Sequence, residues 1–593
     1  GYRLGYKKNG EADYKYINSP TPEFNLSGLS VNTQYFIKVT AVAGSYESEK
    51  PYYQEFKTES VDYKYPMTIS DNESFIDWMT YGAEFTSPSD QITLAADLDL
   101  KGVEIPVVAE FGGVFNGNGK AIKNWSSNHA LFNKVTGTVK DLTIDATCVF
   151  TPASSVFAPV TLSNSGTLSN VHNKANVAYS SNSFDESVNM AGIAAESTGE
   201  IKDCSNSGSI SAKTTGGMKG VAAAGIAGYI DAKISGCSNE GAVSISGQYI
   251  NGYSTIGSIS NAVPNVAGIV ALAGTNFSMS NCENRGKISL VNTNIEKQHE
   301  NKISARRQSA AGIVASPNGN VNNCDNYGEV YVNASTTNHS DYPSYVKSDG
   351  KTSYYECIII VGGISAGDYN AAGQNSSNIS DCKNNGPINF YTDYHGSNNT
   401  AGGIVGWPGI ESNAQTVITK NCVNTGTITV SGKGKVRVGG IQGGTGNMEG
   451  CTNEGAIVFE SGNSGSAVGS ICGFHSQGHI IKNCKALGSV TAKSTVSGIG
   501  GLIGNIGNVA HTTGDGCVVK CIVTGGTEKN AGLIIGLFNG NSKTIKLGTA
   551  AAPIKVSGTI NGTTVTASNY SDYLHGSTKF SASNHILTTV YGE

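Results

Sequence analysis

Short runs of alternating apolar and polar residues recur along most of the chain, and clusters of Gly, Asn and Ser separate them. Alternation with a period of two predicts strands that bury one face. In the clearest stretch, the strand candidates are residues 403–406, 417–419 and 427–430. The pattern therefore predicts an all-β chain in which the strands are short and the turns are frequent.

Two phrases repeat from about residue 91 onwards. One reads Cys-x-Asn-x-Gly-x-Ile/Val, and a second phrase, small-Gly-Ile/Leu, precedes each copy. Complete copies of the first phrase begin at Cys204, Cys237, Cys282, Cys324, Cys382, Cys422 and Cys451. A fixed phrase at a variable interval is the signature of a solenoid whose loops differ in length. With three strand candidates per period, we predict a right-handed parallel β-helix of roughly 11–12 coils with three short strands in each coil.

Three further regions flank this predicted β-helix, which we place at residues 91–550. Residues 61–90 are predicted to hold a linker and a capping helix at about 71–81, with a capping box starting at Ser70. Residues 551–593 are predicted to form a β-rich C-terminal cap. Residues 1–60 form a separate β module, because Tyr35, Ile37 and Val39 alternate with polar residues.

Two of these regions resemble known families. The segment from Leu29 to Tyr35 resembles the tyrosine corner of a fibronectin type III module, so residues 1–60 are expected to be a partial module of that kind. Residues 111–119, Phe-Gly-Gly-Val-Phe-Asn-Gly-Asn-Gly, and residues 121–124 resemble the first coil of the GLUG-like β-helix proteins of gut-type Gram-negative bacteria. That resemblance implies a secreted protein at the cell surface, anchored to the outer membrane through a more N-terminal part.

Composition narrows the possible partners. Charged residues are 14% of the chain and the formal net charge is −5. A nucleic-acid binder needs a basic face to neutralise phosphates, so a nucleic-acid partner is not expected. The sequence holds no run of 18 apolar residues, so we also expect no transmembrane segment.

The repeated Cys and Asn positions are predicted to be structural. Stacked coils place equivalent residues about 4.8 Å apart, so each position forms a column. Buried cysteine behaves as a small hydrophobic residue, and stacked asparagines hydrogen-bond along their column. The sequence leaves open whether Cys517 and Cys521 form a disulfide.

Candidate chemistry is sparse along the chain. Enzymes on parallel β-helices need a compact acidic cluster, and the repeat strands carry no adjacent pair of carboxylates. Asp97 and Asp99 fit a structural role in the opening coil. His475 and His479 are separated by Gly478 in a β context, which argues against a metal pair. We therefore expect no catalytic activity, no cofactor and no metal.

Three long insertions give the strongest functional signal. The insertions leave the same corner of successive predicted coils, at residues 244–265, 289–309 and 331–360. They are therefore expected to lie side by side and to bind a ligand. Aromatic faces flanked by polar groups suit sugar rings. The predicted ligand-binding residues in the insertions and the next coil are Tyr249, Tyr253, His299, Arg306, Arg307, Tyr342, Tyr345, Tyr354, Tyr355, Tyr391, Asp393, Tyr394 and Trp407.

The leading hypothesis is a cell-surface binding or adhesion protein without catalytic activity, whose ligand is a glycan or another host or bacterial surface ligand. Other outer-membrane surface proteins are further candidate partners. The first alternative is a polysaccharide lyase or glycoside hydrolase built on a β-helix. The second alternative is a structural spacer or a component of a surface layer.

Overall fold

The protein is described by a computed structural model of the 593-residue chain. The description covers all residues except 27–28, 31–32, 59–62, 183–186, 215–219, 248–253, 257–258, 263, 294–306, 336–343, 347–351, 355–357, 368–376, 394–398, 409–417, 445, 462, 476–478, 494, 508–511, 539–544, 577–584 and 593.

The N-terminal residues form an antiparallel sheet in which β3 is central. Its strands are β1 (Tyr2–Lys8), β2 (Lys15–Ser19), β3 (Gln34–Ala43), β4 (Tyr46–Glu47) and β5 (Tyr52–Lys57). The side chain of Tyr35 is 2% exposed, and its hydroxyl oxygen accepts a hydrogen bond of 2.9 Å from the backbone N–H of Ser30. This hydrogen bond ties the start of β3 to the loop that precedes it.

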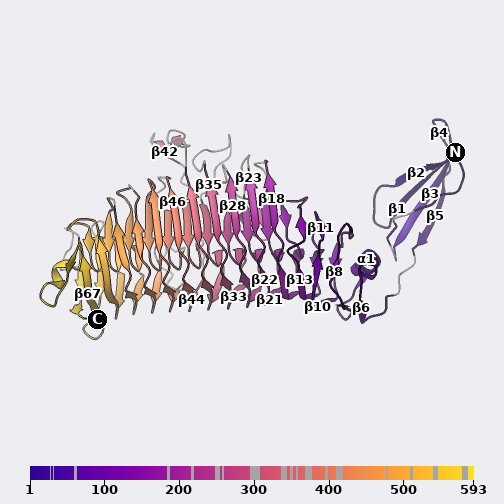
Figure 1. Ribbon diagram of the computed structural model, residues 1–593. Helices are drawn as coiled ribbons and strands as arrows, with labels where there is room; N and C mark the ends of the chain where they lie inside the picture. Colours follow the sequence, from indigo (N-terminus) through magenta and orange to yellow (C-terminus); the bar gives the residue numbers. More distant parts are fainter. Residues whose placement is uncertain are drawn as a thin grey trace.

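A ten-residue helix, α1 (Asn72–Tyr81), packs against the first coils (Figure 1). Trp78 is fully buried, stacks on Phe115 at 5.6 Å between ring centroids, and meets Phe111 edge-on at 6.0 Å. The N-cap is Asp71, whose carboxylate accepts from the Ser74 N–H at 2.8 Å. The predicted capping box was therefore one residue too early. A short 3₁₀ turn, η1 (Ala83–Phe85), follows the helix.

Parallel strands stacked in long ladders make up most of the remaining residues that the structure describes, which confirms the predicted β-helix (Figure 1). A representative coil contains β19 (Val188–Ala191), β20 (Ala194–Ser197), β21 (Glu200–Lys202), β22 (Ser205–Asn206) and β23 (Ile210–Thr214). The first strand belongs to one sheet and the second to another. The last three share a third sheet that bends twice, so three sheets surround the core.

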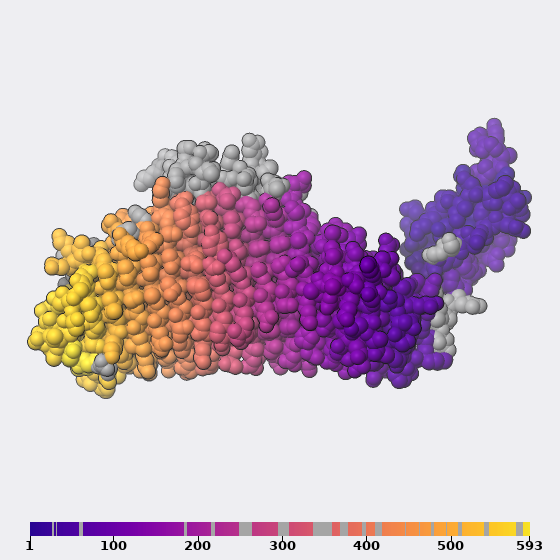
Figure 2. Space-filling view, in the orientation of Figure 1, coloured from indigo at the N-terminus to yellow at the C-terminus, as the bar shows by residue number. Residues whose placement is uncertain are grey.

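Each strand pairs with its equivalent one coil away, and Figure 2 shows successive coils as adjoining bands of colour. The 11-stranded sheet consists of β15 (Val156–Phe157), β19, β24 (Val221–Ala224), β31 (Asn265–Ala267), β36 (Arg307–Ala311), β43 (Ile358–Gly362), β47 (Asn399–Gly402), β51 (Val436–Gly439), β55 (Ala467–Gly469), β60 (Gly498–Gly500) and β64 (Ala531–Gly532). The second face consists of β9 (Glu110–Phe111), β12 (Phe132–Val135), β16 (Thr161–Asn164), β20, β25 (Ala227–Ile230), β32 (Val270–Ala273), β37 (Val314–Ser316), β56 (Cys472–His475), β61 (Ile503–Ile506) and β65 (Ile535–Phe538).

The third sheet holds three columns of strands. The first column runs through β6 (Met67–Ile69), β7 (Gln91–Leu94), β10 (Val114–Lys123), β13 (Thr138–Ile144), β17 (Thr167–Asn173), β21, β26 (Lys233–Ser235), β33 (Phe277–Ser280), β38 (Gly319–Asn322), β44 (Ile379–Ser380), β48 (Ile418–Lys420), β52 (Asn447–Glu449), β57 (Ile480–Lys482), β62 (Thr512–Asp515), β66 (Ile545–Leu547) and β69 (His585–Leu587). The second runs through β22, β27 (Ser238–Asn239), β34 (Glu283–Asn284), β39 (Asp325–Asn326), β45 (Lys383–Asn384), β49 (Val423–Asn424), β53 (Thr452–Asn453) and β58 (Lys485–Ala486).

The third column ends each coil, just before the connection to the next one. It contains β11 (Ser126–Ser127), β14 (Val149–Phe150), β18 (Val177–Ser181), β23, β28 (Val243–Gly247), β35 (Ile288–Asn292), β40 (Val330–Ala334), β46 (Ile388–Thr392), β50 (Ile428–Gly432), β54 (Ile457–Phe459), β59 (Ser489–Ala492), β63 (Val518–Thr524) and β67 (Ile554–Ile560). β8 (Leu98–Asp99) pairs with the end of β10 and β70 (Thr589–Tyr591) with the start of β67, so both align with the second column. β68 (Thr563–Thr564) folds back on β67, and η2 (Tyr570–Tyr573) follows it.

The small-Gly-Ile phrase marks a bend between two sheets. The predicted strand at 403–406 is displaced, because the observed strand β47 ends at Gly402 and Ile404 is buried in the core. A Cβ atom on Gly402 would lie 1.9 Å from the carbonyl oxygen of Val405. The bend is therefore too tight for a side chain at this position, and alternation alone could not reveal it.

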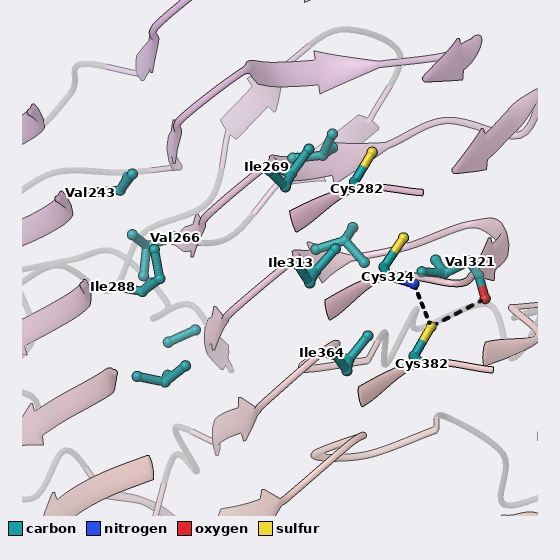
Figure 3. Packing of buried hydrophobic residues seen from close by; sticks show 14 of the residues in the cluster. Val243, Val266, Ile269, Cys282, Ile288, Ile313, Val321, Cys324, Ile364 and Cys382 are labelled. Carbon is teal, nitrogen blue, oxygen red and sulfur yellow. Dashed lines mark hydrogen bonds between the residues drawn. The ribbon is translucent and has the colours of Figure 1, made fainter. Parts of the chain in front are cut away.

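Both predicted columns are present inside the solenoid. Figure 3 shows Cys282, Cys324 and Cys382 one above the next beside a column of isoleucines, and the Cys324 N–H donates to the Cys382 sulfur at 3.4 Å. The twelve cysteines in the described residues are buried and free, Cys517 and Cys521 among them. The thiols therefore pack as part of the core.

The asparagine column is a continuous hydrogen-bonded ladder. Each amide nitrogen donates at 2.7–2.8 Å to the amide oxygen one coil further, and to the backbone carbonyl two residues ahead. Its members are Asn173, Asn206, Asn239, Asn284, Asn326, Asn384, Asn424 and Asn453, and the last of them donates to Ser470. All are fully buried, so the ladder satisfies polar groups that the bend would otherwise leave unpaired.

Candidate functional site

The three long insertions start on neighbouring coils. They follow β28, β35 and β40, which pair in parallel register with Val243 opposite Ile288 and Ile288 opposite Val330. Two insertions contain short antiparallel hairpins, β29 (Ser254–Ile256) with β30 (Ile259–Ala262), and β41 (Ser344–Val346) with β42 (Thr352–Tyr354). Figure 1 shows β42 beyond the wall that β35 and β46 form.

Most of the predicted ligand-binding residues lie in these insertions. Tyr345 and Tyr354 are on the paired backbones of β41 and β42, where Tyr345 is opposite Ser353 and Tyr354 is opposite Ser344. Outside the described residues lie Tyr249, Tyr253, His299, Arg306, Tyr342, Tyr355 and Tyr394. The geometry of the site therefore comes from the strands from which the insertions start.

Tyr391 and Asp393 are brought together at the end of β46. The Tyr391 hydroxyl donates to Asp393 Oδ2 at 2.9 Å, and the Asp393 backbone N–H donates to the Ala334 carbonyl at 3.1 Å. The hydrogen bond to Asp393 and burial both raise the pKa of Tyr391. The carboxylate thus fixes the tyrosine hydroxyl while the ring remains partly exposed on the wall.

A second tyrosine lies on the preceding coil. The ammonium group of Lys287 is 4.7 Å from the centre of the Tyr331 ring and 2.8 Å from Glu329 Oε2. Asn389 donates to the other oxygen of Glu329 at 2.7 Å. Burial opposes ionisation of Glu329, but the hydrogen bonds from Lys287 and Asn389 prevail and lower its pKa. The ring is therefore surrounded by groups that are already oriented.

The third tyrosine is at the bend before β40. Tyr327 is 40% exposed, and the Arg285 guanidinium lies 4.4 Å from its ring centre while pairing with Glu283. Asp325 is opposite Glu283 in the strand register, and burial raises its pKa. We call Arg285, Lys287, Tyr327, Tyr331 and Tyr391 the aromatic wall.

Sequence reasoning missed four of the five members of the aromatic wall. The signal was available, because Tyr327 follows the ladder asparagine and Tyr331 follows the first buried residue of its strand. Both positions point outward in every coil. They could have been found by extending the search from the insertions to the outward positions of the neighbouring strands.

Arg307 and Trp407 lie elsewhere on the coil. Arg307 starts β36 and pairs with Ile358 in the 11-stranded sheet. Trp407 is 3% exposed and packs with Ile358, Ile360 and four alanines in a small cluster outside the main core. The Arg437 guanidinium is 5.4 Å from the centre of the Trp407 ring. These residues flank the bend between two sheets and are separate from the aromatic wall.

Within the described residues, no three His, Cys, Asp or Glu side chains are grouped so that they could hold a metal ion. His475 and His479 have ring centroids 5.9 Å apart, and burial lowers the pKa of His475 to about 3. That imidazole is therefore neutral in the interior. Among the same residues, no helix is long and apolar enough to cross a membrane.

No family model and no curated protein matches the chain. One similar solved structure is "a putative immunoglobulin A1 protease from Bacteroides ovatus", with 14% identity, a TM-score of 0.32, and coverage of 48% of this chain and 91% of that chain. Another, named "IgA1 Protease", has 14% identity, a TM-score of 0.31 and coverage of 74% of this chain. This chain spans 29% of the length of that second structure's chain.

The names of these neighbours contradict the expectation that the chain is not an enzyme, and we withdraw that expectation. The sequence reveals only those carboxylates that are adjacent along the chain. Stacked coils also bring together carboxylates that are far apart in the chain, such as Glu283 and Asp325. The low TM-scores carry no argument about substrate or mechanism.

Proposed function

We propose that this chain binds a glycan on the aromatic wall beneath the stacked insertions, and that it does so at the surface of a Gram-negative cell. The supporting observation is that Tyr327, Tyr331 and Tyr391 occupy two consecutive coils with their polar partners already fixed. Apolar C–H faces of sugars stack on such rings, and the surrounding carboxylates and amides can bond the hydroxyl groups at the ring edge.

The position of the wall adds to this argument. It lies on the strands from which the long insertions start, and loops on one side of a rigid scaffold are the usual place for recognition. The resemblance of residues 111–124 to GLUG-like proteins and of residues 29–35 to a fibronectin type III corner supports the proposed adhesive role outside the outer membrane. Both resemblances remain part of the proposal.

A glycan array probed with the full chain tests the proposal. Tyr327→Ala and Tyr331→Ala should each weaken binding to the selected glycan by roughly tenfold, which corresponds to about 1.4 kcal/mol. Tyr46→Ala is the matched control, because Tyr46 is 81% exposed on the N-terminal sheet and should leave the affinity unchanged. Absence of binding to every glycan on the array would refute the proposal.

The contribution of the third insertion needs a separate variant. A deletion must spare β40 and β43, whose residues belong to the ladders, so residues 336–357 are the part to replace with a short Gly-Ser linker. If the wall is the main binding surface, this variant retains measurable affinity. If the insertion alone binds, the affinity disappears while both tyrosine variants bind normally.

A further inference from the structure

A chain of four polar side chains crosses three coils near the N-terminal end of the β-helix. Ser205 on β22 is in register with His172 on β17, and Ser205 Oγ lies 2.7 Å from His172 Nδ1. On the other side of the ring, His172 Nε2 is 2.9 Å from Asn170 Oδ1. Asn170 Nδ2 in turn donates to Asp141 Oδ1 at 2.8 Å.

This chain of contacts determines where the imidazole proton resides. A carboxylate only accepts, so Asp141 orients the Asn170 amide with its nitrogen toward the carboxylate and its oxygen toward His172. The amide oxygen also only accepts, so Nε2 of His172 must carry the proton. In the neutral ring, Nδ1 then offers its lone pair to the Ser205 hydroxyl.

The surroundings keep this histidine neutral. Burial and the positive charge of Lys174 lower the pKa of His172, and the Asp141 charge opposes them only in part. The ring borders an open surface cavity of about 290 Å³. The cavity is lined by His172, Lys174 and Ser205 together with Thr143, Ser238 and Glu240. A neutral base, the serine hydroxyl bonded to its lone pair and room for a substrate therefore meet at one place.

We propose that Ser205 and His172 form a hydrolytic site for carboxylic esters, with Ser205 as the nucleophile and His172 as the general base. Asn170 is the positioning residue that sets the tautomer of the ring. Lys174, which lines the same cavity, supplies positive charge for the developing oxyanion. The open polar cavity suits a small acyl group carried on a hydroxylated molecule.

The proposed reaction needs no reagent other than the ester and water. Ser205 Oγ bonds to the ester carbonyl carbon as its proton passes to His172 Nδ1, and the C–O bond of the alcohol then breaks as the alcohol takes that proton. Water next adds to the acyl-serine and gives a proton to His172. The bond to Oγ breaks, Ser205 recovers its proton, and the carboxylic acid leaves.

Hydrolysis of p-nitrophenyl acetate by the full chain measures this activity. Ser205→Ala and His172→Ala should each lower the rate at least 100-fold, toward the uncatalysed rate. Ser211→Ala is the matched control, since Ser211 is a partly exposed serine of the same coil on β23. A Ser205→Ala protein that keeps the wild-type rate overturns the proposal.

Two measurements keep the test independent of folding in the variants. A fluorophosphonate should label wild-type protein at Ser205, located by peptide mass spectrometry, and labelling elsewhere but not at Ser205 counts against the site. Wild-type hydrolysis should rise with pH through a midpoint below about 6.5, the ordinary histidine value. Asn170→Asp should move that midpoint upward, because a carboxylate that accepts from Nε2–H favours the charged ring. An unmoved midpoint contradicts the role of Asn170.

Discussion

Replacing one rung of the asparagine ladder should destabilise a short segment of the solenoid. Asn326 is fully buried, and its Nδ2 donates to the Gly328 carbonyl at 2.9 Å and to Asn384 Oδ1 at 2.8 Å. Its Oδ1 accepts from Asn284 Nδ2 at 2.8 Å. Asn326→Ala removes three hydrogen bonds, each of which contributes about 1 kcal/mol, so the expected loss is about 3 kcal/mol.

The loss should be local, because each coil of a solenoid contacts only its neighbours. Native-state hydrogen exchange, followed by mass spectrometry, can measure the free energy of local opening. Peptides spanning 282–293, 324–335 and 382–393 should exchange roughly 100-fold faster in the variant, which matches about 3 kcal/mol. A peptide spanning 138–150 should be unchanged.

Cys324→Ala is the control, since Cys324 lies two residues earlier in the same phrase and is also fully buried. It removes one small apolar group with weak hydrogen bonds, so the expected cost is about 1 kcal/mol. If Asn326→Ala costs no more than Cys324→Ala, or if the distant peptide exchanges equally fast, the ladder does not stabilise the coil as argued.

Two further predictions concern the bend and the thiols. Gly402→Ala should lower stability by about 2–3 kcal/mol, seen as a lower thermal midpoint, because its Cβ would meet the Val405 carbonyl; a midpoint equal to the wild-type value would contradict the tight bend. Cys472 and Cys521 are buried, and burial raises the pKa of each thiol to about 12. Both should resist iodoacetamide at pH 8 in the native protein and react in guanidinium, so modification of either in the native state would refute their burial.

The repeated phrase was sufficient to predict the stacking of coils, because Cys, Asn and Gly each have one role at one position of the turn. Exact strand limits were harder to predict. The displaced strand at 403–406 shows why: the chain bends after Gly402, where a Cβ atom would meet the carbonyl of Val405 across the bend, and alternation along the chain does not contain this contact. Local alternation reports burial but not the angle at which sheets meet.

Candidate sites were predicted less completely than the fold. The insertions stood out by length, but Tyr331 belongs to a short regular strand and gained significance only beside Lys287 from the previous coil. His172 and Ser205 are separated by 33 residues and become neighbours through register alone. Such pairs can be found by aligning the phrases first and then comparing equivalent positions in successive coils.

The asparagine ladder also gives the solenoid a net side-chain dipole along its axis. Every amide in it donates toward the C-terminal end, so the side-chain dipoles are parallel and add along the axis instead of cancelling. If a single amide were reversed, two N–H groups would face each other on one side of it and two oxygens would face each other on the other side. The amides must therefore share one orientation, and each bond polarises the next.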